Sequence, residues 1–162
     1  MKHYVIFYVR RVKPDNKVLL VLKDRPEWQK NKYNLPGGKL EEGELPEDAA
    51  VRELKEETGY IPSSPVQLMG QMIDGDHVIH CYDVVIDDLS DPKPRDGETE
   101  LVEWHVWGEI INNPKLIPNL RVIIPLIQSG SVGWKITDDK SERLFGKSND
   151  HVIQINIPTY YE

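Results

Sequence analysis

Three glutamates near the middle of the chain have the spacing needed to share a divalent cation. Glu53, Glu56 and Glu57 lie in the segment from Pro46 to Thr58, whose apolar residues recur with helical spacing. On a helix with about 100° per residue, the three side chains fall within one arc of about 100°. Like charges placed in this way repel one another by about 0.2–0.5 kcal/mol per pair on an isolated helix. A bound cation removes the repulsion, so the pattern indicates a metal site.

The ligand type predicts the metal. Carboxylate oxygens without a neighbouring cysteine or histidine favour Mg²⁺ or Mn²⁺ over zinc. His77 and His80 are three residues apart on an expected strand and so point to opposite faces, while the histidines at 3, 105 and 151 are isolated. A histidine metal site is therefore not expected. Gly37-Gly38-Lys39-Leu40 is not a phosphate-binding P-loop, since it lacks the spaced glycine and the Ser or Thr after lysine.

The helix that carries the glutamates has recognisable ends. Pro46 suits the first turn, where its missing N–H needs no partner, and Gly59 is a plausible C-terminal stop. The side chains expected to pack on a sheet occupy the adjoining arc: Ala50, Val51, Leu54 and Thr58. Upstream, Pro36-Gly37-Gly38 predicts an irregular turn whose backbone can approach the carboxylates.

Strands are expected on both sides of this helix. Residues 3–12 and 17–23 are β-rich and are separated by a turn-forming cluster, which predicts an antiparallel pair. The remaining expected elements are a second hairpin over 66–73 and 78–86, a short strand over 101–106, a helix over 120–128 and a late strand within 151–157. Mixed strands around two helices predict an α+β fold or an α/β/α sandwich.

Length and composition limit the class of protein. A chain of 162 residues, 39% of them hydrophobic, can bury one core and is expected to form one domain. The net charge of −7 argues against a nucleic-acid-binding module, although cations can hold an anionic small substrate against an acidic site. Cys81 is the only cysteine, which fits a reducing cytoplasm. No apolar stretch approaches the roughly 20 residues that span a membrane.

The glutamates belong to a longer pattern. Gly38, five residues, Glu44, seven residues and then Arg52-Glu53-Leu54-Lys55-Glu56-Glu57-Thr58-Gly59-Tyr60 resembles the Nudix box in all its fixed Gly, Glu and Arg positions. Tyr60 departs from the aliphatic residue usual in that family, which we expect to affect packing. The resemblance implies an α+β Nudix-type α/β/α sandwich with a mixed sheet. It implies a single Nudix hydrolase domain over residues 1–162, with 131–162 as a C-terminal extension.

The resemblance also implies roles for residues. Glu53, Glu56 and Glu57 would bind Mg²⁺, with Mn²⁺ as a possible substitute, helped by a backbone carbonyl of Gly37 or Gly38. Arg52 and Glu44 would orient the carboxylates through charge-assisted bonds. A further carboxylate is expected from the loop before Trp104. Glu98 is the first choice as metal ligand or general base, with Glu100 and Glu103 as rivals and solvated surface acids as the alternative.

The implied reaction is attack of water on one phosphorus of a pyrophosphate linkage. The substrate expected first is a nucleoside triphosphate, as in MutT-type relatives, giving a nucleoside monophosphate and pyrophosphate. Asn119 is similar in position to a purine-reading asparagine of those proteins, or is a helix cap. The alternatives are a nucleotide-sugar or dinucleotide pyrophosphatase, or a Nudix module that binds a nucleotide without cleaving it. The three repelling glutamates argue against the last alternative.

Overall fold

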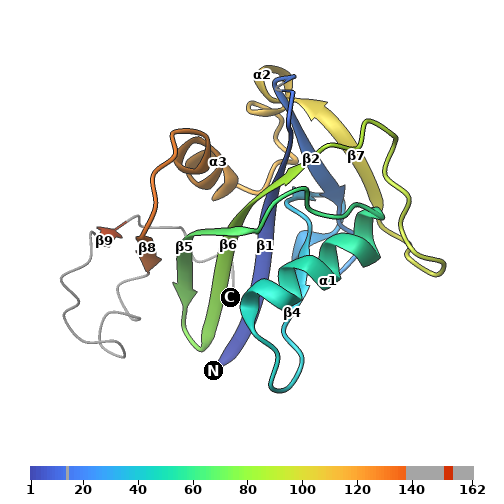
Figure 1. Ribbon diagram of the computed structural model, residues 1–162. Helices are drawn as coiled ribbons and strands as arrows, with labels where there is room; N and C mark the ends of the chain where they lie inside the picture. The colour runs from blue at the N-terminus through green and yellow to red at the C-terminus, as the bar shows by residue number, and fades with distance from the viewer. Residues whose placement is uncertain (14, 138–151, 155–162) are drawn as a thin grey trace.

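The computed structural model describes residues 1–13, 15–137 and 152–154 (Figure 1). The strands are β1 (Lys2–Arg11), β2 (Lys17–Leu22), β3 (Tyr33–Asn34), β4 (Gly37–Lys39), β5 (Gln67–Asp74), β6 (His77–Ile86), β7 (Leu101–Val106), β8 (Trp134–Thr137) and β9 (Val152–Gln154). The helices are α1 (Pro46–Thr58), α2 (Trp107–Ile110) and α3 (Leu120–Gln128), with a 3-10 turn η1 (Glu27–Gln29). No helix among these residues is both long and apolar enough to cross a membrane.

The strands of this part of the chain form two sheets. The larger has the order β4-β1-β6-β5-β8-β9 and is mixed, because β1 runs parallel to β6 and antiparallel to β4. The smaller has the order β3-β2-β7 and is antiparallel. The parallel pairing of β1 with β6 brings together segments far apart in sequence, with Val5 opposite His80. This pairing places the N-terminal strand inside the larger sheet, between β4 and β6.

Side chains alternate between two cores along β1. Val5, Phe7 and Val9 pack with Ala50 and Leu54 of α1 on one face of the sheet. Tyr8 belongs to the core on the other face, which contains Ile123 and Ile124 of α3. Figure 1 shows α1 and α3 on opposite sides of β1 and β6. The predicted mixed α/β sandwich is therefore confirmed.

One predicted pairing is wrong. Residues 3–12 and 17–23 do form strands, but β1 and β2 belong to different sheets. A strand has only two hydrogen-bonding edges, and those of β1 are used by β4 and β6. Val12 continues beside β6 by donating its N–H to the Ile86 carbonyl at 2.9 Å. The second predicted hairpin is confirmed, since β5 and β6 are antiparallel around Gly75.

Three local predictions also differ from the structure. The irregular turn expected around Pro36 instead continues into β4, because Gly37 has no side chain to strike β1: a Cβ there would lie 2.0 Å from the Val5 oxygen. Val51 does not pack on the sheet but is exposed. β8 was not expected, and of the late strand only residues 152–154 are described. Residues 151 and 155–157 lie outside the described part.

Candidate active site

The three glutamates are carried by a helix whose ends lie where the sequence predicts them. α1 begins at Pro46 and ends before Gly59, whose φ of 75° is left-handed and whose N–H donates to the Lys55 carbonyl at 2.9 Å. Ala50, Leu54 and Thr58 are buried against the sheet. The face that carries Glu53, Glu56 and Glu57 is left partly exposed beside β4.

The backbone of β4 lies directly against two of these carboxylates. The Gly37 N–H donates a hydrogen bond of 2.9 Å to Glu57 Oε2. A Cβ on Gly38 would lie 2.3 Å from the carboxyl carbon of Glu53, so a larger residue there would push the Glu53 side chain aside. The Gly37-Gly38 pair is therefore required both for pairing with β1 and for the approach of Glu53 and Glu57.

Burial strongly affects the two carboxyl groups beside β4. Burial raises the pKa of Glu57 to about 8, against smaller opposing effects from the Gly37 N–H and Lys23. The pKa of Glu53 is raised by burial too, opposed by its contact with Arg52. Without a cation, Glu57 therefore holds its proton over much of the neutral range. A nearby positive charge would stabilise the ionised form of such buried carboxyl groups.

Arg52 and Glu44 form the most completely bonded ion pair of the site. Arg52 donates from Nε to Glu44 Oε1 at 2.7 Å and from Nη2 to Glu44 Oε2 at 2.9 Å, which is a two-pronged contact. Its Nη1 donates to Glu53 Oε1 at 2.6 Å, and Nη2 also reaches the Lys39 carbonyl at 3.1 Å. The Arg52 guanidinium holds the pKa of Glu44 down at about 2. Arg52 thus connects the loop before α1 to Glu53.

The three candidate acids from the later loop lie in different surroundings. Glu98 accepts a bond of 2.9 Å from Arg95 Nε, and Arg95 also contacts Glu56. Glu100 is partly buried, accepts from Lys23 Nζ at 2.8 Å and acts electrostatically on Glu57. Glu103 is exposed on β7, where it lies opposite Leu20 of β2. Glu98 and Glu100 are therefore close to the glutamates of α1, and Glu103 is in the neighbouring sheet.

The acidic side chains share one region without converging on one point. Among the described residues, no three Asp, Glu, His or Cys side chains are gathered closely enough to hold a metal ion. The contacts explain this arrangement: Arg52 binds Glu53, and Arg95 lies 2.9 Å from Glu56. Arginine nitrogens therefore contact Glu53 and Glu56, while Glu57 accepts from the Gly37 N–H. The sequence did not single out Arg95, since an exposed loop arginine has no distinctive spacing.

Asn119 does not act as a cap. It occupies the position before α3, but its side chain makes no capping hydrogen bond. Its Nδ2 points to Met72 Sδ at 3.5 Å, and its Oδ1 is buried with no hydrogen-bond partner in the described structure. An unpaired buried carbonyl oxygen is costly.

The histidines require one correction. His77 and His80 face opposite sides of β6 as predicted, but His3 is not isolated, because the parallel pairing of β1 and β6 brings it to His80. His3 Nδ1 lies 3.1 Å from His80 Nε2, and His80 Nδ1 lies 3.0 Å from Gln71 Nε2. Burial lowers the pKa of His80. These rings form a hydrogen-bonded chain on the side of the sheet that carries α1.

Tyr60, where the sequence departs from the usual box, has a packing role. It is buried, and its hydroxyl donates to the Ser90 carbonyl at 2.7 Å. The same hydroxyl accepts from Trp104 Nε1 at 3.1 Å. Tyr60 therefore joins the end of α1 to β7 and to the loop that carries Arg95 and Glu98.

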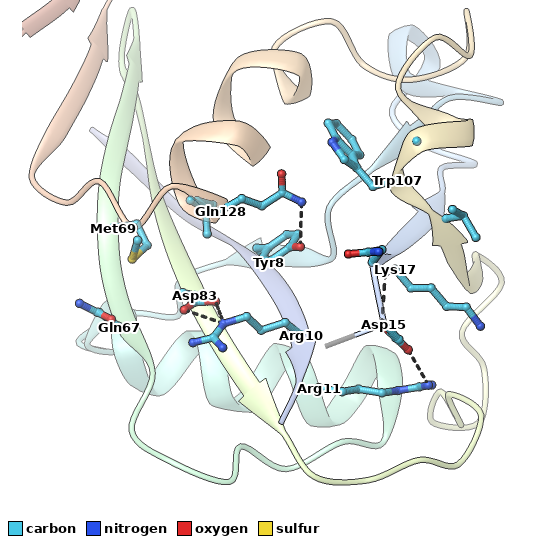
Figure 2. Close-up of a pocket in the computed structure, with 15 residues that line it drawn as sticks. Tyr8, Arg10, Arg11, Asp15, Lys17, Gln67, Met69, Asp83, Trp107 and Gln128 are labelled. Atoms are coloured by element: carbon cyan, nitrogen blue, oxygen red, sulfur yellow. Dashed lines mark hydrogen bonds and ion pairs between the residues drawn. The ribbon is translucent and has the colours of Figure 1, made fainter. Parts of the chain in front are cut away.

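A separate pocket lies at the far end of the sheet. It has a volume of about 780 Å³, and Figure 2 shows Arg10 paired with Asp83 and Gln128 bonded to Tyr8 within it. Lys17, at the start of β2, also lines this pocket. Lys23, which pairs with Glu100, follows the other end of that strand. None of the α1 glutamates is among its lining residues. This pocket is therefore distinct from the acidic site.

Comparisons with known proteins identify the family of this chain. A family model described as NUDIX domain matches residues 1–127. The uncharacterized Nudix hydrolase YvcI of Bacillus subtilis is 34% identical over 119 residues, covering 66% of this chain and 72% of that protein. The chain therefore belongs to the NUDIX family. The predicted class, a Nudix pyrophosphohydrolase, is confirmed at the level of that family.

Two further relatives have named activities. The ADP-ribose pyrophosphatase of Bacillus subtilis is 32% identical over 108 residues, 64% of this chain and 57% of that protein. The ADP-sugar pyrophosphatase of Mus musculus is 38% identical over 94 residues, 53% of this chain and 43% of that protein. The chain thus spans about half the length of these two relatives.

Solved structures share the fold. A NUDIX-family hydrolase from Clostridium perfringens has a TM-score of 0.62 at 21% identity, covering 79% of this chain and 97% of that one. The NUDIX domain of Shewanella oneidensis NrtR, crystallised with ADP ribose, has a TM-score of 0.67 at 19% identity, covering 79% and 86%. At these identities the likeness concerns the fold alone.

Gly38→Ala should impair catalysis more than folding. The added Cβ would meet the flexible end of Glu53, which can move aside, so the stability loss should stay at about 1 kcal/mol. A displaced Glu53 should lower kcat/KM by roughly 10²-fold, the scale of a misplacement of about 1 Å. Gly108→Ala is the control, because a Cβ there meets nothing within 4 Å. Unchanged kcat/KM in Gly38→Ala would contradict the close approach.

Glu44→Gln should reduce the acid sensitivity of folding. The pKa of Glu44 is about 2, below its ordinary value near 4.5, so the ionised pair with Arg52 stabilises the fold above about pH 4.5. That contribution is lost as pH falls toward 2. At pH 7, we expect Glu44→Gln to lower the free energy of unfolding by about 1 kcal/mol. Its free energy of unfolding in urea should then fall less steeply than wild type below pH 4.5. Glu42→Gln, at an exposed position nearby, should leave the free energy of unfolding at pH 7 and its decline below pH 4.5 unchanged.

Proposed function

We propose that this protein hydrolyses the pyrophosphate linkage of a nucleoside diphosphate derivative and requires Mg²⁺, for which Mn²⁺ can substitute. The observation that carries the proposal is the presence of three glutamates on one face of α1, with the Gly37-Gly38 backbone lying against two of them. Burial raises the pKa of Glu53 and Glu57, and a bound cation would stabilise their ionised forms. Such an acidic site could hold a cation between its carboxylates and an anionic substrate, which suits the hydrolysis carried out in this family.

The donor set fits a hard divalent cation. Glu53, Glu56 and Glu57 supply carboxylate oxygens, Gly38 supplies a backbone carbonyl, and Glu98 is our first choice for a further carboxylate. Gly38 also supports the fit, because a Cβ there would fill the space between the β4 backbone and Glu53. When bound, the cation would neutralise charge on the phosphate oxygens and promote attack by water.

The protein's own residues hold the acids for this reaction. Arg52 fixes Glu53 from one side and is itself held by Glu44, so the carboxylate keeps its orientation. The Gly37 N–H fixes Glu57. Glu98, whose side chain is 17% exposed, is our candidate for accepting the proton of the attacking water, with Glu100 as its rival.

A nucleoside triphosphate is our first candidate substrate. Asn119 Oδ1 is buried and has no hydrogen-bond partner in the described structure, so a ligand N–H group would satisfy it. A purine base offers such a group. We therefore propose Asn119 as a base-reading residue, with a nucleoside monophosphate and pyrophosphate as products.

An ADP-sugar is the second candidate, favoured by the length of the matches. The similarity to the 8-oxo-dGTP diphosphatase of Escherichia coli extends over 48 residues, whereas that to the ADP-ribose pyrophosphatase extends over 108. The match of 108 residues is nearly five times the length of the box, which runs from residue 38 to 60, so it includes segments outside the box. Those segments hold the groups that select a substrate.

A panel of substrates tests the proposal. dGTP, 8-oxo-dGTP, ADP-ribose and ADP-glucose would each be incubated with the protein and Mg²⁺, and the products identified by mass spectrometry. Pyrophosphate release with a loss of at least tenfold in kcat/KM for Asn119→Ala supports the first candidate. Release of AMP from ADP-ribose or ADP-glucose supports the second. Nucleotide binding without turnover on any member would favour the non-catalytic module.

The cellular compartment, the binding partner and the domain boundaries also stay proposals. Cys81 is buried and has no second cysteine in this chain to pair with, as suits a reducing cytoplasm. We propose a nucleotide as the partner rather than nucleic acid or a membrane, because the net charge is −7. The single domain with residues 131–162 as an extension also stays a prediction, and the family model ends at residue 127.

A further inference from the structure

The loop from residue 87 to 100 is attached to the C-terminal half of α1 through its backbone. The Lys93 N–H donates to the Thr58 carbonyl at 2.8 Å, and the Arg95 N–H donates to the Glu56 carbonyl at 2.9 Å. Glu98 then turns back, with its N–H 3.2 Å from the Arg95 carbonyl. These bonds fix the backbone of Arg95 beside the acidic face of the helix.

The Arg95 side chain bridges two candidate ligands that come from different elements. Its Nη1 lies 2.9 Å from Glu56 Oε1, and its Nε donates to Glu98 Oε1 at 2.9 Å. Arg52 Nη1 approaches Glu56 Oε2 at 3.5 Å. One guanidinium therefore neutralises a helix acid and a loop acid at once, on the oxygens that a cation would need.

We propose that Arg95 is an internal counter-cation, which holds Glu56 and Glu98 together in the metal-free protein and is displaced when a divalent cation binds. The inference rests on the proposed metal-dependent function. Arg95 lies on Glu56 Oε1 and Glu98 Oε1, so a cation that takes these two oxygens replaces both contacts. The Arg95 side chain is 57% exposed, and exposed ion pairs are weak enough to exchange.

The two arginines of the site, Arg52 and Arg95, differ in how firmly their side chains are held. Arg52 is 24% exposed and makes four hydrogen bonds to Glu44, Glu53 and the Lys39 carbonyl. It can stay in place while Glu53 offers its second oxygen. Within the described part of the chain, the Arg95 side chain has no such anchor beyond the two acids themselves. Arg95, and not Arg52, is therefore the residue that competes with the metal.

Metal affinity gives the direct test. Mg²⁺ and Mn²⁺ would be titrated into wild-type protein and Arg95→Gln by calorimetry at one ionic strength and pH 8, without substrate. We expect Arg95→Gln to bind the cation on the order of three- to tenfold more tightly, the scale of two exposed ion pairs. Lys93→Gln is the matched control, because it removes the same charge from the same loop without touching Glu56. Its affinity should change by less than about twofold.

A double variant separates displacement from general charge. If Arg95 competes through Glu56, Arg95→Gln should tighten binding much less in a Glu56→Gln background than in wild type. The Nε–H signal of Arg95 in NMR should also shift when Mg²⁺ saturates the protein, since its bond to Glu98 breaks. Unchanged or weaker affinity in Arg95→Gln would overturn the inference, as would equal tightening in Lys93→Gln. Wild-type protein that binds neither cation would overturn the proposed function as well.

Discussion

Glu57→Gln should lower kcat by about 10²-fold or more while the protein stays folded. Glu57 accepts a hydrogen bond from Gly37 and lies one turn after Glu53 on α1. Glutamine keeps the shape and one acceptor oxygen but removes the charge that a cation needs. The loss should therefore appear in the chemical step, measured as kcat on the best substrate of the panel.

The same variant should not be less stable at alkaline pH. Burial raises the pKa of Glu57 to about 8, above its ordinary value of 4.5, so the metal-free fold binds a proton that the unfolded chain releases. That contribution is complete below about pH 4.5 and declines as pH rises to 8. Glutamine avoids the decline, and thermal melting at pH 8 should show Glu57→Gln at least as stable as wild type without metal.

Two comparisons complete this experiment. Lys55→Gln changes an exposed residue of the same helix and should keep wild-type kcat. Circular dichroism of all three proteins shows whether they are folded. Equal kcat in wild type and Glu57→Gln would remove Glu57 from the catalytic site.

Chelation of divalent cations with EDTA should reduce turnover by about 10²–10⁴-fold, because the metal supplies several kcal/mol of charge stabilisation. Mg²⁺ or Mn²⁺ should restore the rate, and zinc should not be needed. Turnover at limiting Mg²⁺ should rise from pH 6 to about 8, since Glu57 must lose its proton to bind the cation. The measurement is initial rate against free metal concentration at each pH.

The cation should also stabilise the fold, because a ligand that binds only the native state shifts unfolding by mass action. The melting temperature should rise with Mg²⁺ in wild type and rise less in Glu56→Gln and Glu57→Gln. Lys55→Gln should behave as wild type. Full activity in excess EDTA, or an unchanged rise in both glutamate variants, would place the metal elsewhere.

Features that depend on neighbouring residues could be predicted from the sequence alone. The bounds of α1 follow from Pro46 and Gly59, and the shared face of Glu53, Glu56 and Glu57 follows from the helical repeat. The β5–β6 hairpin follows from the turn at Gly75. The resemblance implies orienting roles for Arg52 and Glu44, which stay predictions; the two side chains form a two-pronged ion pair. These contacts join residues no more than 16 apart, the separation of Gln67 and Asp83 in the hairpin, so local pattern is sufficient.

Only the tertiary structure decided the contacts between distant segments. The parallel pairing of β1 with β6 excludes the predicted β1–β2 hairpin and brings His3 to His80, 77 residues away. The same packing leaves Asn119 Oδ1 buried and unpaired in the described structure, where the sequence allowed a cap. It also places Arg95 between Glu56 and Glu98. Which edges pair and which side chains meet depends on the packing of the whole core, and no local spacing encodes it.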